Sequence, residues 1–288
     1  MGSKVIITFI IIMICGCAKQ QTVQFNSEET LKFQCKMSVL RENNNRMSLE
    51  DHRVAAEKEG IEICQITLAV RYRQGLGVPV DYTLAKKFYG MTPLGLISLA
   101  EMAELGQGEP VNLAKAEYLY REATQKGDTC FRLNLAEFLH KHSRSVEEVS
   151  ELYSKSLDEA CPGTKKSFYT VHQSGFAFPD EAVKKYQLLW FASFRNSVGN
   201  RLARYKPLKN RQATLKQDIE VPIVFMFRKS TEMPLLTIST ASADENVDNL
   251  LIQYFSNKKL YQDFLFCQAQ EELEVKWTVN ILKTGVQH

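Results

Sequence analysis

Few side chains in this sequence lie at spacings that support catalysis or metal binding. His140 and His142 are two residues apart in a segment with helical periodicity. They would point about 200° apart around a helix and cannot hold one metal ion together. Ser167 and His172 have no carboxylate implied beside them, which a hydrolase triad requires, and Cys267 in DFLFCQ is explained more simply as a core residue. We predict no catalytic residue, no metal and no cofactor, and expect a protein that is not an enzyme.

Two glycine pairs, Gly75 with Gly77 and Gly106 with Gly108, raise the question of a phosphate-binding loop. Such a loop follows a strand, opens a helix and continues with Lys and Ser or Thr. Neither pair is followed by these residues, and both flanks have helical periodicity. We therefore predict that each pair ends one helix in the left-handed conformation, and that a proline with Asp or Asn starts the next.

The amino-terminal segment predicts export. Lys4 precedes the apolar run Val5–Ile14, which is shorter than the roughly 20 residues of a spanning helix and fits a secretory signal. The closing sequence ICGC resembles the lipobox of bacterial lipoproteins, in which the signal is cut before a cysteine that is then acylated. The match falls on Cys17, because Gly16 fits the small position before the cut. It implies a signal peptide over residues 1–16; an ordinary signal peptide or a short membrane anchor are the alternatives.

Location and charge narrow the choice of partner. Ala18 rather than Asp follows Cys17, which by analogy with enteric lipoproteins implies the outer membrane, and we expect the lipid-anchored chain to face the periplasm. The sequence has 36 basic and 33 acidic residues, a net charge of +3. This near balance argues against nucleic acid as the main partner.

An internal repeat organises the middle of the chain. The segment LAVRYRQGLGVPVDYTLAKKFY (68–89) aligns with LAEMAELGQGEPVNLAKAEYLY (99–120) at a constant offset of 31 residues. A third copy begins at GDTCFRLNLAEFLH, where the glycine turn is missing, and SGFAFPDEAVKKYQLLW (174–190) is a faint fourth. A repeat of this length indicates units that each bury one face on the next.

This repeat resembles the Sel1-like repeat, a relative of the tetratricopeptide repeat. The first copy matches the family pattern at these positions: Ala56, Gly60, Leu68, Tyr72, Gly75, Gly77, Val78, Asp81 and Ala85. The second copy has Glu109 for the valine and Asn112 for the aspartate, and its preceding linker is about five residues short. The resemblance implies an α-solenoid of helical hairpins over residues 59–198, with a concave surface for a protein or peptide partner.

Helical spacing supports the same arrangement independently of the resemblance to the Sel1-like repeat. Apolar and small residues of the second copy recur at i, i+3, i+4 and i+7 on one face. Small side chains would let neighbouring helices pack closely, and they are Ala69, Ala85, Ala100, Ala103 and Ala116. Candidate contacts with a partner are Tyr72, Tyr89, Tyr118 and Tyr120. At their helical spacing some of these four tyrosines must be core residues.

Five cysteines follow Cys17, so one thiol must stay free or bridge to another molecule. Cys130 stands at the start of one expected helix and Cys161 just past the end of its partner, and an antiparallel hairpin brings these ends together. We predict a disulfide between them, contributing roughly 3–4 kcal/mol by chain entropy. Two buried thiols are the alternative, and Cys35 with Cys64 is a second candidate pair.

The flanking segments have different characters. Residues 17–58 contain helical pieces expected to cap the first hairpin. Residues 199–216 are expected to form a basic linker or exposed helix end, with six basic and no acidic side chains from Arg201 onward. This basic segment is either a contact for anionic lipid or an acidic partner, or simply a solvated face.

Residues 217–288 predict a small α+β domain, because the periodicity changes from 3.6 to 2. Strands are expected over 220–228, 235–241 and 273–281, and a helix that opens with a capping box of Ser242 and Glu245 precedes the last of them. The order strand, strand, helix, strand looks like the C-terminal domain of the TonB and TolA family, whose members bind partners at a sheet edge. The expected fold class is thus mostly α, a solenoid followed by this small α+β domain.

The leading functional hypothesis is a lipid-anchored envelope protein that binds a protein or peptide partner through the helical stack. The C-terminal domain would make a second contact. A hydrolase of cell-wall material or beta-lactams is one alternative, implied by cysteine-rich relatives of the repeat discussed as binders of penicillin-like compounds. A TonB-like or TolA-like coupling protein is the other.

Overall fold

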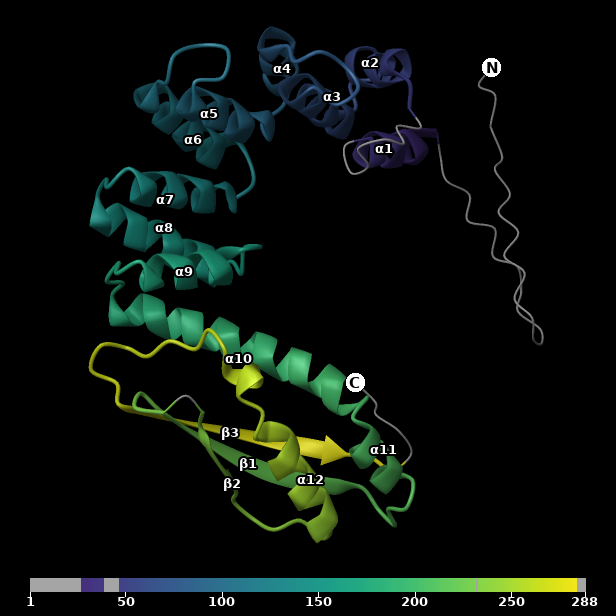
Figure 1. Ribbon diagram of the computed structural model, residues 1–288, viewed down its shortest axis with the longest axis vertical. Coiled ribbons are helices and arrows are strands. Elements are labelled where there is room, and N and C mark those ends of the chain that lie inside the picture. Colours follow the sequence, from purple (N-terminus) through teal and green to yellow (C-terminus); the bar gives the residue numbers. More distant parts are fainter. Residues whose placement is uncertain (1–26, 39–46, 232, 284–288) are drawn as a thin grey trace, which may run out of the picture. The chain divides into compact units, whose positions relative to one another are not determined.

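The chain divides into two compact units, Met1–Leu135 and Ala136–His288 (Figure 1). The computed structural model describes residues 27–38, 47–231 and 233–283. The predicted signal peptide and Cys17 lie outside the described residues. The border between the units falls inside the range 59–198 that the sequence assigns to the repeats.

The first unit is built from helices arranged as successive hairpins. The helices are α1 (Ser27–Met37), α2 (Leu49–Glu57), α3 (Glu62–Gln74), α4 (Tyr82–Tyr89), α5 (Gly95–Leu105) and α6 (Leu113–Lys126), and α7 (Phe131–Lys141) runs across the border. The pairs α3 with α4 and α5 with α6 correspond to the first two sequence repeats. The five alanines expected between helices have no exposed surface: Ala69, Ala85, Ala100, Ala103 and Ala116. Their small side chains let the helices of each hairpin pack closely.

The corners of the two hairpins have the same construction. Gly75 and Gly106 end α3 and α5 in the left-handed conformation, at φ of 75° and 69°, which a residue with a Cβ adopts only at a cost. The side chains of Asp81 and Asn112 then cap the next helices, each accepting a hydrogen bond from the backbone N–H three residues on. Each glycine pair therefore forms a helix corner.

Helices also dominate the second unit. They are α8 (Val146–Asp158), α9 (Thr164–Gln173), α10 (Asp180–Leu202), α11 (Lys206–Gln212), α12 (Glu245–Phe255) and the short 3-10 helix η1 (Lys258–Tyr261). The corner before α8 turns at Ser143, at a φ of 51°, and Ser145 caps the helix. A serine can occupy this conformation at some cost, so the third copy makes its turn here without a glycine. No helix within the described ranges is both long and apolar enough to span a bilayer.

A three-stranded antiparallel sheet follows in the second unit. Its strands are β1 (Ile219–Arg228), β2 (Leu235–Ile238) and β3 (Glu272–Ile281), in the order β2-β1-β3. Ile223 of the central strand faces Ile238 on one side and Trp277 on the other. The predicted chain order and the predicted fold class are confirmed: the chain is mostly helical, with a small sheet near its C-terminal end. The likeness to the TonB and TolA family remains a prediction.

Helices α10 and α12 lie against the sheet (Figure 1), and aromatic side chains pack both of them on the same face of β1. The ring of Phe225 on β1 lies 6.0 Å from that of Phe194 on α10 and 5.2 Å from that of Phe255 on α12, both edge to face. Trp277 on β3 contacts the same two rings. Such pairs add roughly 0.5–1.5 kcal/mol each beyond the burial of their area. Helix α10 begins in the fourth repeat copy. Farther along, its aromatic side chains belong to the core that covers one face of the sheet.

The start of α12 differs from the predicted capping box. Asp244, and not Ser242, is the N-cap, and its carboxylate accepts hydrogen bonds from the backbone N–H groups of Asn246 and Val247. Glu245 is the first residue of the helix and cannot take the third position that a capping box requires. An aspartate carboxylate satisfies two free N–H groups at once and interacts favourably with the positive end of the helix.

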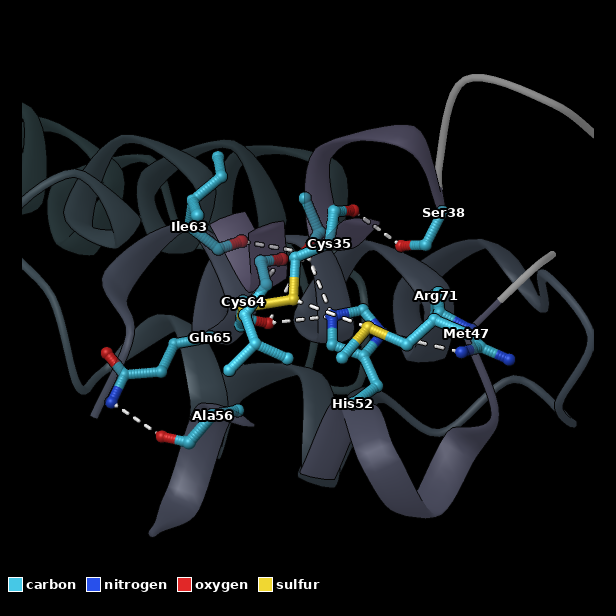
Figure 2. Close-up of a disulfide and its surroundings, with 11 residues drawn as sticks. Cys35, Ser38, Met47, His52, Ala56, Ile63, Cys64, Gln65 and Arg71 are labelled. Atoms are coloured by element: carbon cyan, nitrogen blue, oxygen red, sulfur yellow. Dashed lines mark hydrogen bonds between the residues drawn. A yellow bond between two sulfur atoms is a disulfide. The ribbon is translucent and has the colours of Figure 1, made fainter. Parts of the chain in front are cut away.

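Four cysteines of the described chain are in disulfide bonds, and they are the four that the sequence offered as candidates. The second candidate pair, Cys35 and Cys64, forms a disulfide that joins α1 to α3 (Figure 2). Cys130 and Cys161 are disulfide-bonded as well, and their pairing with each other stays a prediction. Cys267 is the free cysteine of the described chain, and it is buried.

Candidate binding surface on the repeat hairpins

The four tyrosines considered as partner contacts lie in different environments. Tyr72, Tyr89 and Tyr120 are 7%, 1% and 5% exposed, so they are core residues and not surface contacts. Tyr118 on α6 is 64% exposed and stays a candidate. The helical phase explains the difference, because two residues correspond to about 200° around the axis. With Tyr120 in the core, Tyr118 must point outward.

Exposed aliphatic side chains lie at the two hairpin corners. Val80 and Val111 occupy equivalent positions of the repeat and are 53% and 62% exposed, and Leu105, beside the second corner, is 56% exposed. The corners are neighbours, because a Cβ added at Gly108 would lie 2.5 Å from Cβ of Tyr82, at the start of α4. The term corner surface is used below for Val80, Leu105 and Val111 at the corners, together with Tyr118, which is exposed on α6.

Ion pairs hold the second corner against the neighbouring helices. Glu109 lies 3.1 Å from Nζ of Lys86 on α4 and 2.9 Å from Nζ of Lys115 on α6. These hydrogen bonds, from Lys115 and then Lys86, lower the pKa of Glu109. Glu109 is the residue that stands where the first repeat copy has Val78. Here the departure from the repeat pattern serves as a polar connection, although a half-exposed pair of this kind contributes at most about 1 kcal/mol.

A second polar connection joins the first hairpin to the next. Arg73 of α3 donates to Gln107 Oε1 at 2.7 Å and to Glu101 Oε2 at 2.8 Å. Its side chain is only 13% exposed, so these charge-assisted bonds are less screened than those of a surface pair. The corner surface is therefore presented by hairpins whose relative position is held by specific contacts.

A buried polar cluster lies beside the disulfide and was not predicted. His52 of α2 has no exposed surface, and Figure 2 shows its ring between Cys64 and Arg71. Its Nε2 lies 3.1 Å from the carbonyl oxygen of Cys64, and its Nδ1 lies 3.4 Å from Nη1 of Arg71. A neutral imidazole satisfies both contacts, donating through Nε2 and accepting at Nδ1. Burial, and then the charge of Arg71, lower the pKa of His52 to about 4.

The positions of His52 and Arg71 in their helices are the feature of the sequence that could have indicated this cluster. His52 precedes Ala56 by four residues, and Arg71 follows Leu68 by three. Both side chains thus share a face with residues expected in the core. The sequence could not show that the two elements bring these side chains together.

We expect the first unit to lose stability as the pH falls from about 6.5 to about 4. The ordinary pKa of histidine is 6.5 and that of folded His52 is about 4, so the unfolded chain takes up this proton first. The contribution is complete above pH 6.5 and is lost through the window below it, by about 3 kcal/mol. Urea unfolding at pH 7 and pH 4.5 measures it. The variant His52→Gln should show a shallower pH dependence, and an unchanged slope would contradict the assignment.

The residues examined for catalysis do not assemble a hydrolytic site. The hydroxyl of Ser167 lies 2.7 Å from that of Tyr153, and Nδ1 of His172 is buried without a hydrogen bond inside the described chain. Burial raises the pKa of the Cys267 thiol. This thiol therefore stays protonated at neutral pH, whereas the thiolate is the nucleophile.

No protein-family model matches the chain, and no curated protein is significantly similar to it. Among solved structures, it is similar to a Sel1 repeat protein from Oxalobacter formigenes, at 16% identity over 62% of this chain and 77% of that one, with a TM-score of 0.45. It is also similar to a protective antigen of uropathogenic Escherichia coli strains that displays an SLR fold. There the identity is 22% over 66% of this chain and 40% of that one, with a TM-score of 0.44.

Proposed function

We propose that this chain is a lipid-anchored scaffold of the bacterial cell envelope that binds a protein partner through its repeat hairpins. The observation that carries the proposal is the corner surface, in which Val80, Leu105 and Val111 are exposed at neighbouring corners and Glu109 forms ion pairs at the second of them. Protein interfaces combine an apolar centre with a polar rim. Burial of these side chains by a partner would contribute roughly 25 cal/mol per Å².

The construction of the corners favours binding without rearrangement. Left-handed glycines and capping side chains define the backbone at each corner, and Glu109 and Arg73 connect the helices around it. A surface that is already ordered loses little conformational entropy when a partner binds. The repeat hairpins therefore suit a partner that docks as a folded surface or a short segment.

The envelope location is supported by two observations of different kinds. The sequence around Cys17 resembles a lipobox, and several acyl chains on one cysteine would exceed what stable anchoring requires. The disulfide between Cys35 and Cys64 fits a chain that folds in an oxidising compartment. Intact mass of the chain isolated from membranes tests the anchor. We expect the mass of a lipidated chain beginning at Cys17, and a Cys17→Ser variant should remain unprocessed and unacylated.

We expect partner binding to depend on the corner surface. A photo-crosslinking amino acid at position 118 in intact cells should capture one protein, identified by mass spectrometry. With that protein purified, Val111→Ser and Tyr118→Ala should each weaken binding about tenfold, as for a residue near an interface centre. Val146→Ser is the matched control, because Val146 is 52% exposed but lies in the second unit, outside the corner surface. Equal affinities for all three variants would refute this binding mode.

The hydrolase alternative has a direct test. The purified chain is incubated with muropeptides and with a beta-lactam, and the products are followed by chromatography. We expect no turnover, because the hydroxyl of Ser167 is hydrogen-bonded to that of Tyr153 and the thiol of Cys267 is buried and protonated. Turnover that survives both Ser167→Ala and Cys267→Ala would reveal a catalytic site elsewhere and would overturn the scaffold proposal.

A further inference from the structure

The second unit contains a hollow between α11 and α12 with an unusual lining. Its volume is about 570 Å³, and it is wide open to solvent, as a hollow for a segment of chain on the protein surface must be. The lining residues are Pro207, Asn210, Arg211, Thr214, Asn246, Asn249, Leu250 and Gln253. Half of these side chains are carboxamides, each of which offers both a donor and an acceptor.

The carboxamides of α12 form a row. Asn246, Asn249 and Gln253 follow one another at i, i+3 and i+7 and therefore lie along one face of the helix. A rise of 1.5 Å per residue places them about 4.5 and 6 Å apart along the axis. Asn210 faces them from α11. The row can thus make successive hydrogen bonds to a ligand that runs along the helix.

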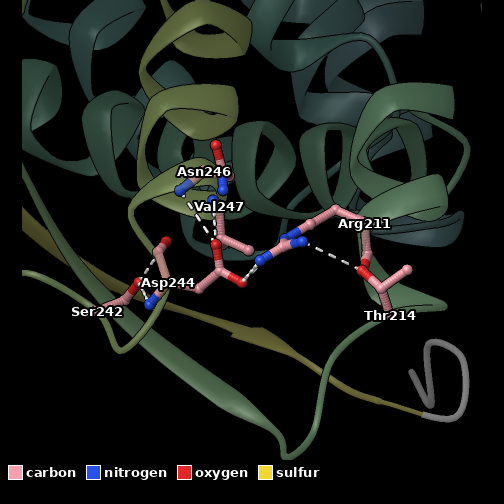
Figure 3. A network of polar contacts seen from close by, with 6 residues as sticks. All are labelled: Arg211, Thr214, Ser242, Asp244, Asn246 and Val247. Carbon is pink, nitrogen blue, oxygen red and sulfur yellow. Dashed lines mark hydrogen bonds and ion pairs between the residues drawn. The ribbon is translucent and has the colours of Figure 1, made fainter.

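The charge of the hollow is already balanced. Arg211 donates to Oδ2 of Asp244 through Nε at 2.9 Å and also through Nη2 (Figure 3). The hydrogen bond from Arg211 lowers the pKa of Asp244, so the pair remains ionised and mutually neutralised at neutral pH. A hollow of this kind suits a neutral ligand rich in donors and acceptors, and not a phosphate or a metal ion.

The carboxamides are available to such a ligand. Within the described chain, the side chains of Asn210, Asn246 and Asn249 are exposed and make no hydrogen bond to other residues. The hydroxyl of Tyr205 lies 3.5 Å from Oε1 of Gln253, which leaves the NH₂ group of that side chain as a donor. The apolar part of the lining is Leu250 and Pro207, and no lining residue is aromatic.

We propose that this hollow binds an extended stretch of main chain from the protein partner. In an extended peptide, groups that point to one side recur about every 6.7 Å, close to the roughly 6 Å between Asn249 and Gln253 along α12. A carboxamide can accept from one peptide N–H and donate to one C=O. A saccharide would ordinarily rest on an aromatic ring, and the lining provides none. The proposal rests on the proposed function in one respect, that the partner is a protein.

A nuclear magnetic resonance titration tests the site in the full-length chain. The protein is labelled with ¹⁵N and titrated with a pool of acetylated, amidated octapeptides of neutral composition. We expect the side-chain amide signals of Asn246, Asn249 and Gln253 to shift and saturate. Asn249→Leu should weaken the best peptide about 25-fold, since it removes two hydrogen bonds and each costs roughly a factor of five. N-methylation of that peptide's main-chain amides should weaken it similarly.

A matched control and a competing ligand make the result decisive. Asn196→Leu removes an exposed carboxamide from α10, outside the hollow, and should leave both peptide affinity and thermal stability unchanged. Peptide binding that tolerates N-methylation, or chitin tetrasaccharide giving these shifts while peptides do not, would overturn the main-chain mode. If no peptide shifts these signals, the hollow is not the site. Partner binding that still depends on Tyr118 would then leave the proposed function intact.

Discussion

Replacing Gly95 with alanine is expected to destabilise the first unit by about 3–5 kcal/mol. Gly95 is the first residue of α5 and is buried. A Cβ added there would lie 1.9 Å from the carbonyl oxygen of Tyr89 and 2.7 Å from its carbonyl carbon. Both atoms belong to the backbone at the end of α4, so no side-chain movement relieves the overlap. The junction of the two repeat hairpins would have to open.

The short linker before the second repeat copy explains this close approach. The connection from α4 to α5 covers only residues 90–94. Gly95 stands 31 residues after Cys64, another fully buried small residue at the start of a repeat helix. With a longer linker α5 could lie farther from α4. With this short linker, α5 can pack against α4 only because residue 95 has no side chain.

Urea unfolding followed by circular dichroism measures the effect. The matched control is Gly199→Ala on α10, because a Cβ there meets nothing within 4 Å. Inside a helix this change should stabilise the chain by about 0.5–1 kcal/mol. A cost below about 1 kcal/mol for Gly95→Ala would show that the hairpins separate easily and are not held in one arrangement.

Removing the disulfide by Cys35→Ala with Cys64→Ala is expected to cost about 3–4 kcal/mol. The two cysteines are 29 residues apart, and closing a loop of this length restricts the unfolded chain by roughly that amount. Both side chains are fully buried, and alanine avoids an unsatisfied hydroxyl in their place. Because the disulfide joins α1 to α3, the loss should appear first as faster hydrogen exchange in α1.

Comparison with and without a reductant separates the disulfide from simple packing. The intact chain should lose stability on reduction, and the double variant should lose less. Any response that the double variant keeps reports the disulfide bonds of Cys130 and Cys161, whose pairing peptide mapping would establish. Cys267→Ala is the control, because it removes a buried free thiol and should leave the response to reductant unchanged. Equal responses of the intact chain and the double variant would rule out a stabilising role for the bond.

Local signals predicted the elements well where a few neighbouring residues decide the conformation. Gly75 and Gly106 take the left-handed conformation because their own backbone requires it, and Asp81 and Asn112 cap helices through contacts three residues away. The alternation from Leu273 to Ile281 also predicted β3. The capping box at Ser242 was the exception, because aspartate two residues later offered a better acceptor at the same helix start.

Contacts between distant residues were predicted less well. Tyr72, Tyr89 and Tyr120 share helical spacing with surface positions, and only packing showed that they are buried while Tyr118 is exposed. Cys35 pairs with Cys64 because α1 lies against α3. The number of residues between two cysteines does not tell how far apart they lie in the folded protein.

By itself, the sequence determined the repeat, its helix corners, the change to a small sheet and the expectation of export, since each depends on residues close together in the chain. Tertiary structure alone decided that Cys35 meets Cys64, that His52 and Arg71 share a buried site, and that α11 and α12 line an open hollow rich in carboxamides. These features depend on how helices far apart in the sequence pack. Many packings satisfy the same periodicity, and only one brings these particular side chains together.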